Sequence, residues 1–527
     1  MININYTGGI LLMDRKKLKN TRVSNKNLTK KHKISAAGFI SMSILTVYGV
    51  TNGEQMYYQM GYQAITYALL AMLLFFIPYS FAVAEMGSAF SEKKGGIYSW
   101  LSEIIGEKYA LVTTMIWYST GLIGGLSISS ICIKFSTMFY GKDVSETWHL
   151  FGLSNQMTTT LIGAVWVLFW IFISTKGIKS VEILTKIAML LFLYNNIFTL
   201  VVSLWIFFSN RMHFAQSFIW RGISSLFMGP NPSYHSIFSM LGFMVFAIMI
   251  FGGMEAASGL VDEVENPKKT VPKGIFITVV VVFILTIIVI IGSGMVINWK
   301  EVYGNPNVNL YNFSVYLLLK YYSSLGIALG MSAAHAAIFA KWYMIIYSWI
   351  GALAFLQIPL GYYYPIKQLI EGLPKGILPK IITKKNKHNF PANMLWLQGI
   401  FMCSFAVIVT LIFGNNANQI YNYTTFMVTV SSVIPWGLIT FAYIKFKAND
   451  NIEKHYKFFS KKVGITYNLI SLFVIIFAVV FSLIQPWTTP GGAEEGILML
   501  FGPILFGGIG FIIAYRYRAF VKKRKNE

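Results

Sequence analysis

The sequence predicts an all-α integral membrane protein with about twelve transmembrane helices, of which the first and the sixth are interrupted. Three observations predict this fold class. The 527 residues are 55% hydrophobic and only 12% charged, whereas a soluble domain averages about 25% charged residues. Apolar stretches of about 18 residues or more recur along the whole chain. The Lys and Arg residues gather in alternate connections, as they do in the cytoplasmic loops of membrane proteins.

The apolar stretches set the order of the expected helices. They begin near Ile34, Ala64, Leu111, Thr159, Ile183, Phe238, Gly274, Lys341, Met394, Tyr421, Gly464 and Ile497. The interruptions in spans one and six are five helices apart, so these two helices cross the membrane in opposite directions. An inverted repeat of five helices requires this offset. We therefore expect spans one to five and six to ten to form a 5+5 inverted repeat, with two additional C-terminal helices.

Two polar connections are expected to form helices outside the membrane core. The segment AEMGSAFSEKKGGIYSWLSEIIGEKYA, between spans two and three, is too polar to cross. It holds one apolar helical face, which predicts an interfacial helix on the cytoplasmic side and consists of Ile97, Trp100, Leu101, Ile104 and Ile105. An ordinary loop is the alternative. Residues 310–340 are only intermittently apolar and are expected to form extracellular helices packed over the bundle.

The basic residues orient the chain. Its formal net charge is +23, and roughly 36 of the 43 Lys and Arg residues lie in the two tails and in alternate loops. This placement predicts a multi-pass protein of the cell membrane with both termini in the cytoplasm. The positive charge therefore reflects the orientation of the chain in the membrane. It indicates no nucleic-acid partner, and the partner that it implies is the lipid bilayer. We expect a disordered basic cytoplasmic tail at 1–33, one transmembrane domain at 34–518 and a short basic cytoplasmic tail at 519–527.

The sixth span contains the stretch FGGMEAASG, with two adjacent glycines and an acid, Glu255, where a membrane helix should be continuous. A charge at mid-membrane depth costs at least about 2.5 to 3.5 kcal/mol on insertion scales, and paired glycines weaken the helix. Broken helices at this depth line a cavity or are buried in protein, and in transporters they hold substrate. The alternative is a kinked helix in which Glu255 bonds to a neighbouring helix.

The first span supplies a matching interruption. It turns polar from Tyr48, through Gly49, Val50, Thr51 and Asn52, to Gly53. The second half of this helix presents free N–H groups and a positive dipole end, which suit a substrate carboxylate. The first half of span six is expected to end near Phe251, Gly252 and Gly253, and its free carbonyls suit an ammonium group. The two breaks together predict a site for a zwitterion, such as an amino acid, with Tyr48 and Phe251 as apolar walls or as simple packing residues.

Two further polar groups are candidates for the transport mechanism. Glu255 lies within one turn of the expected ammonium site, so it could exchange a proton during transport or pair with a cation. Gln357 in span eight could contact substrate, although a lone Gln more often makes an interhelical hydrogen bond. The sequence holds no HExxH, Walker or other catalytic motif and no ATP-binding domain, so we expect no enzyme activity, no metal and no cofactor. Gradients or exchange would drive transport.

The stretch VDEVENPKKTVPKGI after FGGMEAASG resembles a signature of the amino acid, polyamine and organocation superfamily of permeases, and the polar segment before span three resembles its first cytoplasmic loop. The resemblance covers residues 34–518 and is closest to the glutamate:GABA antiporter branch, in particular to its YjeM-like inner-membrane permeases. It implies the five-plus-five fold with alternating access, and substrate held between helices one and six.

Two departures from the family pattern bear on substrate. Arginine and agmatine exchangers carry an aromatic residue where this chain has Met249, which argues against a dicationic substrate. Glutamate:GABA antiporters carry a Glu where the alignment places Gln357, which implies different coupling. We therefore expect a secondary active transporter, an antiporter or a proton-coupled permease, for a small amino acid or related amine. The alternative is a non-transporting membrane sensor or partner subunit built on a permease fold.

Overall fold

The computed structural model describes residues 33–49, 51–176, 178–217, 226–352, 355–356, 358–373, 376–388, 390–413, 417–488 and 492–526. Within these residues the secondary structure is helical, and the β-type pairing is a single parallel bridge between Ile34 and Val264. The predicted all-α class is therefore confirmed. Residues 1–32 of the expected N-terminal tail lie outside the described residues.

The described residues of the first half of the chain form twelve helical elements in this order. They are α2 (Ala36–Val47), α3 (Asn52–Met60), α4 (Gln63–Ala71), η2 (Met72–Phe76), α5 (Ile77–Ala89), α6 (Gly96–Ile104), α7 (Glu107–Gly124), η3 (Gly125–Ser130), α8 (Ile131–Tyr140), η4 (Ser145–Thr147), α9 (Asn155–Ser174) and α10 (Ile178–Ser209).

The second half continues the bundle. It consists of η6 (Pro232–Tyr234), α11 (Ile237–Ile250), η7 (Met254–Glu263), α12 (Pro267–Val296), α13 (Trp299–Tyr303), α14 (Phe313–Ala328), α15 (Ala333–Ala352), α16 (Ile358–Gly372), α17 (Lys380–Thr383), α18 (Ala392–Phe413), α19 (Ala417–Ala448), α20 (Lys461–Ile484), η9 (Gln485–Thr488) and α21 (Ala493–Asn526). The C-terminal tail expected at 519–527 is thus a continuation of α21 as far as Asn526.

Local sequence explains where several helices begin and bend. Ser35, Ser154 and Ser236 cap α2, α9 and α11, because each hydroxyl accepts a bond from an N–H of the first turn. The second span changes to a π-helical turn, η2, just before Pro78, which has no N–H to donate to the preceding turn. Tyr467 Oη on α20 donates to the Leu73 carbonyl of this turn at 2.5 Å.

Nine helical segments in the described residues are long and apolar enough to cross a membrane, or ten when α7 and α8 count as one span bent by 42°. All belong to spans expected from the sequence. The first expected span is missing from this count because it is divided between α2 and α3. The eighth falls on α15 and α16, between which residues 353, 354 and 357 are not described. The total of twelve and the inverted repeat remain predictions.

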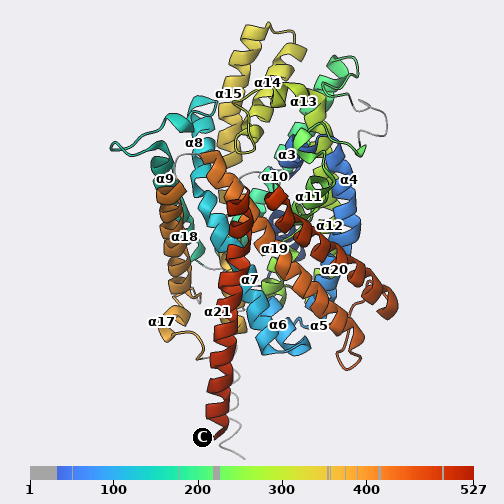
Figure 1. Cartoon of the computed structure of the whole chain (residues 1–527), viewed down its shortest axis with the longest axis vertical. Coiled ribbons are helices and arrows are strands. Elements are labelled where there is room, and N and C mark those ends of the chain that lie inside the picture. The colour runs from blue at the N-terminus through green and yellow to red at the C-terminus, as the bar shows by residue number, and fades with distance from the viewer. Residues whose placement is uncertain are drawn as a thin grey trace, which may run out of the picture.

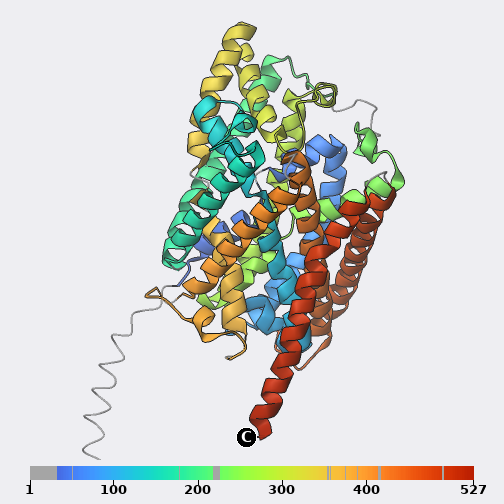
Figure 2. The same cartoon turned by 60° about the vertical axis from the view of Figure 1, so that its left-hand side comes forward.

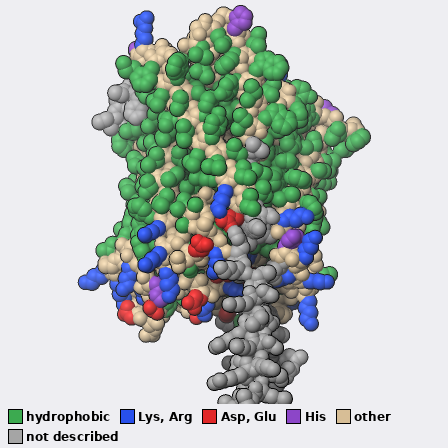
Figure 3. Space-filling view, turned by 180° about the vertical axis from the view of Figure 1, so that it is seen from behind, with side chains coloured by type: hydrophobic (Ala, Val, Ile, Leu, Met, Phe, Trp, Pro, Cys, Tyr) green, Lys and Arg blue, Asp and Glu red, His purple; other side chains and the backbone are tan. Residues whose placement is uncertain are grey.

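The helices pack side by side in one bundle (Figures 1 and 2). Helices α14 and α15 rise at one end of it, and the C-terminal part of α21 projects from the other. On the face shown in Figure 3, a broad apolar band crosses the molecule, and most Lys and Arg side chains gather below it. A lipid-facing belt with cations concentrated at one end fits a multi-pass membrane protein.

The helix expected between spans two and three is present as α6. It begins after Gly95, which has a φ of 90°, and a Cβ there would lie 2.2 Å from the Gly372 Cα of α16. Its apolar side chains Ile97, Trp100 and Leu101 are each about 1% exposed. This face therefore packs against the protein itself, on α7, α16 and η7, rather than facing lipid.

An ion pair between Glu85 and Lys447 is buried between helices far apart in the sequence. Glu85 on α5 and Lys447 on α19 are 0% and 2% exposed, with 2.5 Å between Nζ and Oε2. The Glu85 carboxylate also accepts bonds from Tyr443 Oη at 3.0 Å, Phe458 N at 2.7 Å and Phe459 N at 3.2 Å. These bonds tie α5, α19 and the connection to α20 together.

Candidate substrate site

The first interruption lies where the sequence predicts it. Helix α2 ends at Val47, Tyr48 is extended with φ −83° and ψ 108°, and α3 begins at Asn52. Thr51 precedes α3 and its hydroxyl caps no N–H group of the first turn, while the Asn52 N–H donates to the Gly49 carbonyl at 3.0 Å. Val50, which was predicted to take part in the site, lies outside the described residues.

The second interruption also matches the prediction. Helix α11 ends at Ile250, and Gly253 has a left-handed φ of 106°. A Cβ on Gly253 would lie 2.8 Å from the Thr46 carbonyl oxygen, so the turn at Gly253 lies against the end of α2. Both breaks therefore meet at one place in the bundle. Gly252 faces the Trp436 ring so closely that a Cβ would lie 1.7 Å from Cη2.

After the break the chain continues as the 3₁₀ helix η7. Side chains of α16 donate hydrogen bonds to the backbone carbonyls of η7. Gln368 Nε2 donates to the Ala256 carbonyl at 3.0 Å, and Lys367 Nζ donates to the Gly259 carbonyl at 2.7 Å. Lys367 also bonds Asp262 Oδ1 at 3.1 Å. Because lipid offers no hydrogen bonds, irregular backbone at this depth requires such internal partners.

Glu255, the acid in the first turn of η7, is 2% exposed and held by two neutral donors. Tyr79 Oη on α5 donates to Oε2 at 2.9 Å, and Trp117 Nε1 on α7 donates to Oε1 at 2.8 Å. No cation forms an ion pair with this carboxylate in the described part of the chain. Tyr79 and Trp117 thus hold the carboxyl oxygens in place without neutralising a charge on them.

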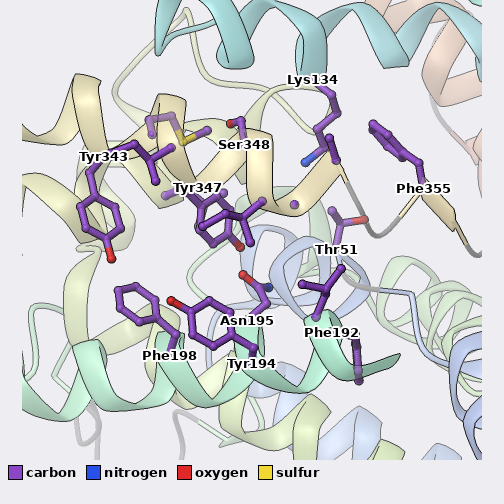
Figure 4. Close-up of a pocket in the computed structure, with 17 residues that line it drawn as sticks. Thr51, Lys134, Phe192, Tyr194, Asn195, Phe198, Tyr343, Tyr347, Ser348 and Phe355 are labelled. Atoms are coloured by element: carbon purple, nitrogen blue, oxygen red, sulfur yellow. The ribbon is translucent and has the colours of Figure 1, made fainter. Parts of the chain in front are cut away.

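Two cavities adjoin the first break. The α15 cavity, of about 270 Å³, lies between α10 and α15 and reaches Thr51 and Lys134 (Figure 4). The α9 cavity, of about 460 Å³, is lined by α3, α7, α8, α9 and α14. They share Thr51, Lys134 and Phe355, so both open beside the amino end of α3.

Of the residues predicted for the site, Thr51 lines both cavities. Tyr48 is buried and its hydroxyl donates to Asn196 Oδ1 at 3.3 Å, while Phe251 is buried and stacks on Phe76. The remaining predicted residues that the structure describes pack around the breaks without lining either cavity: Gly49, Asn52, Gly53, Met249, Gly252, Gly253 and Glu255. Gln357 lies outside the described residues. The predicted roles of these residues in binding and coupling remain predictions.

Paired breaks in a bundle of apolar helices are typical of secondary transporters, and comparison with known proteins gives the family. Residues 33–509 match the model of the family described as "Amino acid permease". The chain belongs to the amino acid permease family. The resemblance read from its motifs is thereby confirmed, and the chain is a membrane transporter.

Relatives of this permease are named as transporters and not as enzymes. It is 33% identical to the inner membrane transporter YjeM of Escherichia coli over 501 residues, which cover 93% of this chain and 97% of that protein. It is 24% identical to a glutamate/gamma-aminobutyrate antiporter of Lactococcus lactis subsp. lactis, over 86% of this chain and 84% of the relative. The aspartate/glutamate permease AcaP of Lactococcus lactis subsp. cremoris is also 24% identical, over 82% and 83%.

The sequence analysis did not single out Lys134, a charged residue that lines both cavities. Its signal was present, because Lys134 interrupts the apolar stretch ICIKFSTMF, and a charge inside a membrane span marks a functional site by default. No sequence pattern points to Tyr79 and Trp117 as partners of Glu255, since they lie 176 and 138 residues away.

Proposed function

We propose that this permease is a secondary active transporter that moves a small amino acid or related amine across the cell membrane by alternating access. The observation that carries the proposal is the contact of the two breaks, where the turn at Gly253 lies against the end of α2, together with the cavity lined by Thr51 of the first break. The relatives named as antiporters and as an amino acid permease support the same substrate class. Both termini face the cytoplasm in this proposal, as the concentration of basic residues indicates.

In the proposed binding mode the substrate is a zwitterion. Its carboxylate faces the uncapped amino end of α3 at Thr51, where backbone N–H groups and the helix dipole favour an anion. Its ammonium group faces the carboxyl end of α11 near Phe251, where the last carbonyls and Glu255 favour a cation. The other residues predicted for the site are proposed to hold the two breaks around the substrate: Tyr48, Gly49, Val50, Asn52, Gly53, Gly252 and Gly253.

Counterflow in proteoliposomes tests this function. Vesicles that contain the purified protein and an unlabelled amino acid are expected to accumulate the labelled amino acid transiently, and protein-free vesicles are not. Screening the amino acids and their decarboxylation products in this assay would identify the substrate. If none supported counterflow while some still raised the melting temperature of the protein, the chain would be a sensor or a partner subunit.

Glu255→Gln is expected to flatten the pH dependence of transport and to leave the fold intact. The glutamine oxygen accepts the Trp117 N–H, and its amide donates to Tyr79 Oη, so both contacts persist without an acidic group. Initial uptake rates between about pH 5 and 8 measure the effect. The control is Glu301→Gln, which removes an exposed acid paired with Lys320. An unchanged pH profile in Glu255→Gln would assign Glu255 a purely structural role.

A further inference from the structure

Lys134 on α8 faces the space beside the first break. It lines both the α15 cavity and the α9 cavity, and of the described residues that line either one it alone carries a charge. Figure 4 shows its side chain descending into the α15 cavity, with its nitrogen between Tyr347 and Thr51. An ammonium group in a membrane-embedded cavity is costly unless an anion accompanies it.

No protein anion in the described part of the chain accompanies Lys134 closely. Its Nζ forms neither a hydrogen bond nor an ion pair within 4.0 Å there. Glu54 on α3 attracts it electrostatically over a longer distance. The Glu54 carboxylate is buried, and its side-chain partner there is Ser314 rather than Lys134. The cation therefore presents its three N–H donors to the cavity and not to a protein acceptor.

A second positive group faces the same space. Thr51, which lines both cavities, is the residue that precedes α3, and the dipole of that helix places its positive end there. The ammonium of Lys134 and the amino end of α3 thus converge on one cavity from different helices. Between them a ligand with two anionic groups is favoured over one with a single carboxylate.

We propose that Lys134 binds a carboxylate on the substrate side chain, so that this permease takes acidic amino acids. The α-carboxylate lies at the amino end of α3, the side-chain carboxylate lies at Lys134, and the α-ammonium faces the carboxyl end of α11. A carboxylate fits better than a phosphate because the cavities offer one cation among hydroxyl, amide and aromatic side chains, and phosphate sites usually gather several cationic or N–H donors. This inference rests on the proposed transport function.

Glu54 allows a second test of the proposal, because its replacement should change the KM in the opposite direction. Its carboxylate attracts Lys134 and therefore competes with a substrate carboxylate for the same ammonium. Replacing Glu54 by Gln removes the competing charge and is expected to lower the KM for an acidic substrate. Replacing Lys134 by Gln removes the binding charge and is expected to raise it. A lysine and a glutamate that only stabilise the fold would not change KM in opposite directions.

The first experiment uses the wild-type chain in proteoliposomes and compares L-glutamate with L-glutamine, which has the same shape without the charge. The KM for glutamate is expected to be about tenfold lower, since a bond to a charged partner is stronger than a neutral one. Lys134→Gln should remove most of this difference and Lys134→Arg should retain it. The matched control is Lys341→Gln, which removes an exposed lysine of α15 that lines neither cavity.

The outcomes separate this inference from the function on which it rests. Equal KM values for glutamate and glutamine in the wild-type chain, or a preference retained in a folded Lys134→Gln, would overturn the role of Lys134 and leave the transporter intact. Absence of counterflow with every amino acid and every related amine would overturn the proposed function itself. If Lys134→Gln does not fold, the wild-type comparison and the direction of the Glu54→Gln effect still decide.

Discussion

Gly252→Ala is expected to abolish transport and to destabilise the protein by about 3 kcal/mol or more, at the upper end of the range for overpacked cores. The added Cβ would lie 1.7 Å from Trp436 Cη2 and 1.9 Å from Cζ2, so the indole or the turn between α11 and η7 must move. Trp436 is buried and its ring packs near Phe75 and Tyr79, which leaves it little room. Counterflow rates and melting temperatures of the purified protein measure both effects.

A second substitution distinguishes steric overlap from other causes. In Gly252→Ala combined with Trp436→Leu the overlapping ring atoms are gone, and stability and transport are expected to recover in part. Trp436 Nε1 makes no hydrogen bond with any described residue, so this replacement breaks none. The control is Gly361→Ala in α16, where an added Cβ meets no atom within 4 Å and should change neither property much. Full activity in Gly252→Ala alone would show that the break tolerates a side chain.

Lys447→Met is expected to cost about 3–5 kcal/mol, because it leaves the buried Glu85 carboxylate without its cation. The bonds from Tyr443 Oη and from Phe458 N and Phe459 N remain, but they come from neutral donors. A large fall in melting temperature should therefore result. Since this pair joins α5 to α19, transport is expected to be lost as well.

The same cluster supplies its own controls. Combining Lys447→Met with Glu85→Gln removes both charges and is expected to recover much of the lost stability, because a neutral amide is far less costly to bury than an isolated carboxylate. Lys461→Met removes a lysine of the same region whose ion pair with Asp450 is exposed to solvent, and little change is expected. A double variant as unstable as Lys447→Met would show that the lysine acts through packing.

The sequence was most informative where a local pattern conflicts with a continuous membrane helix. Glycines and polar residues in an apolar stretch located the breaks at Tyr48–Gly53 and Phe251–Gly253, since such residues weaken a helix whatever surrounds them. The helical face of Ile97, Trp100 and Leu101 identified α6 for a similar reason. The surface that covers this face could not be predicted, because it is built from α7, α16 and η7, which lie elsewhere in the sequence.

The candidate site was predicted only in part, because its geometry depends on residues distant in the sequence. The sequence predicts only that Gly252 interrupts a helix. Glycine is required there because the Trp436 ring, 184 positions later in the chain, leaves no room for a Cβ. The donors to the η7 carbonyls, Lys367 and Gln368, come from α16 and carry no local signal. Lys134 is different, because a charge in an apolar stretch is visible in the sequence itself. Its significance emerges from the cavities that it lines.

The bridge between Ile34 and Val264 constrains how the molecule can move. Ile34 N donates to the Glu263 carbonyl at 2.8 Å, and Glu265 N donates to the Ile34 carbonyl at 2.9 Å. Ile34, two residues before α2, is thus bonded on both sides to the segment at the end of η7. The helix before the first break and the helix after the second break are therefore linked by backbone bonds. A rearrangement that opens this end of the molecule must either move α2 and η7 together as one rigid unit or break these two backbone hydrogen bonds. Because breaking both hydrogen bonds costs free energy, we expect the two helices to move together.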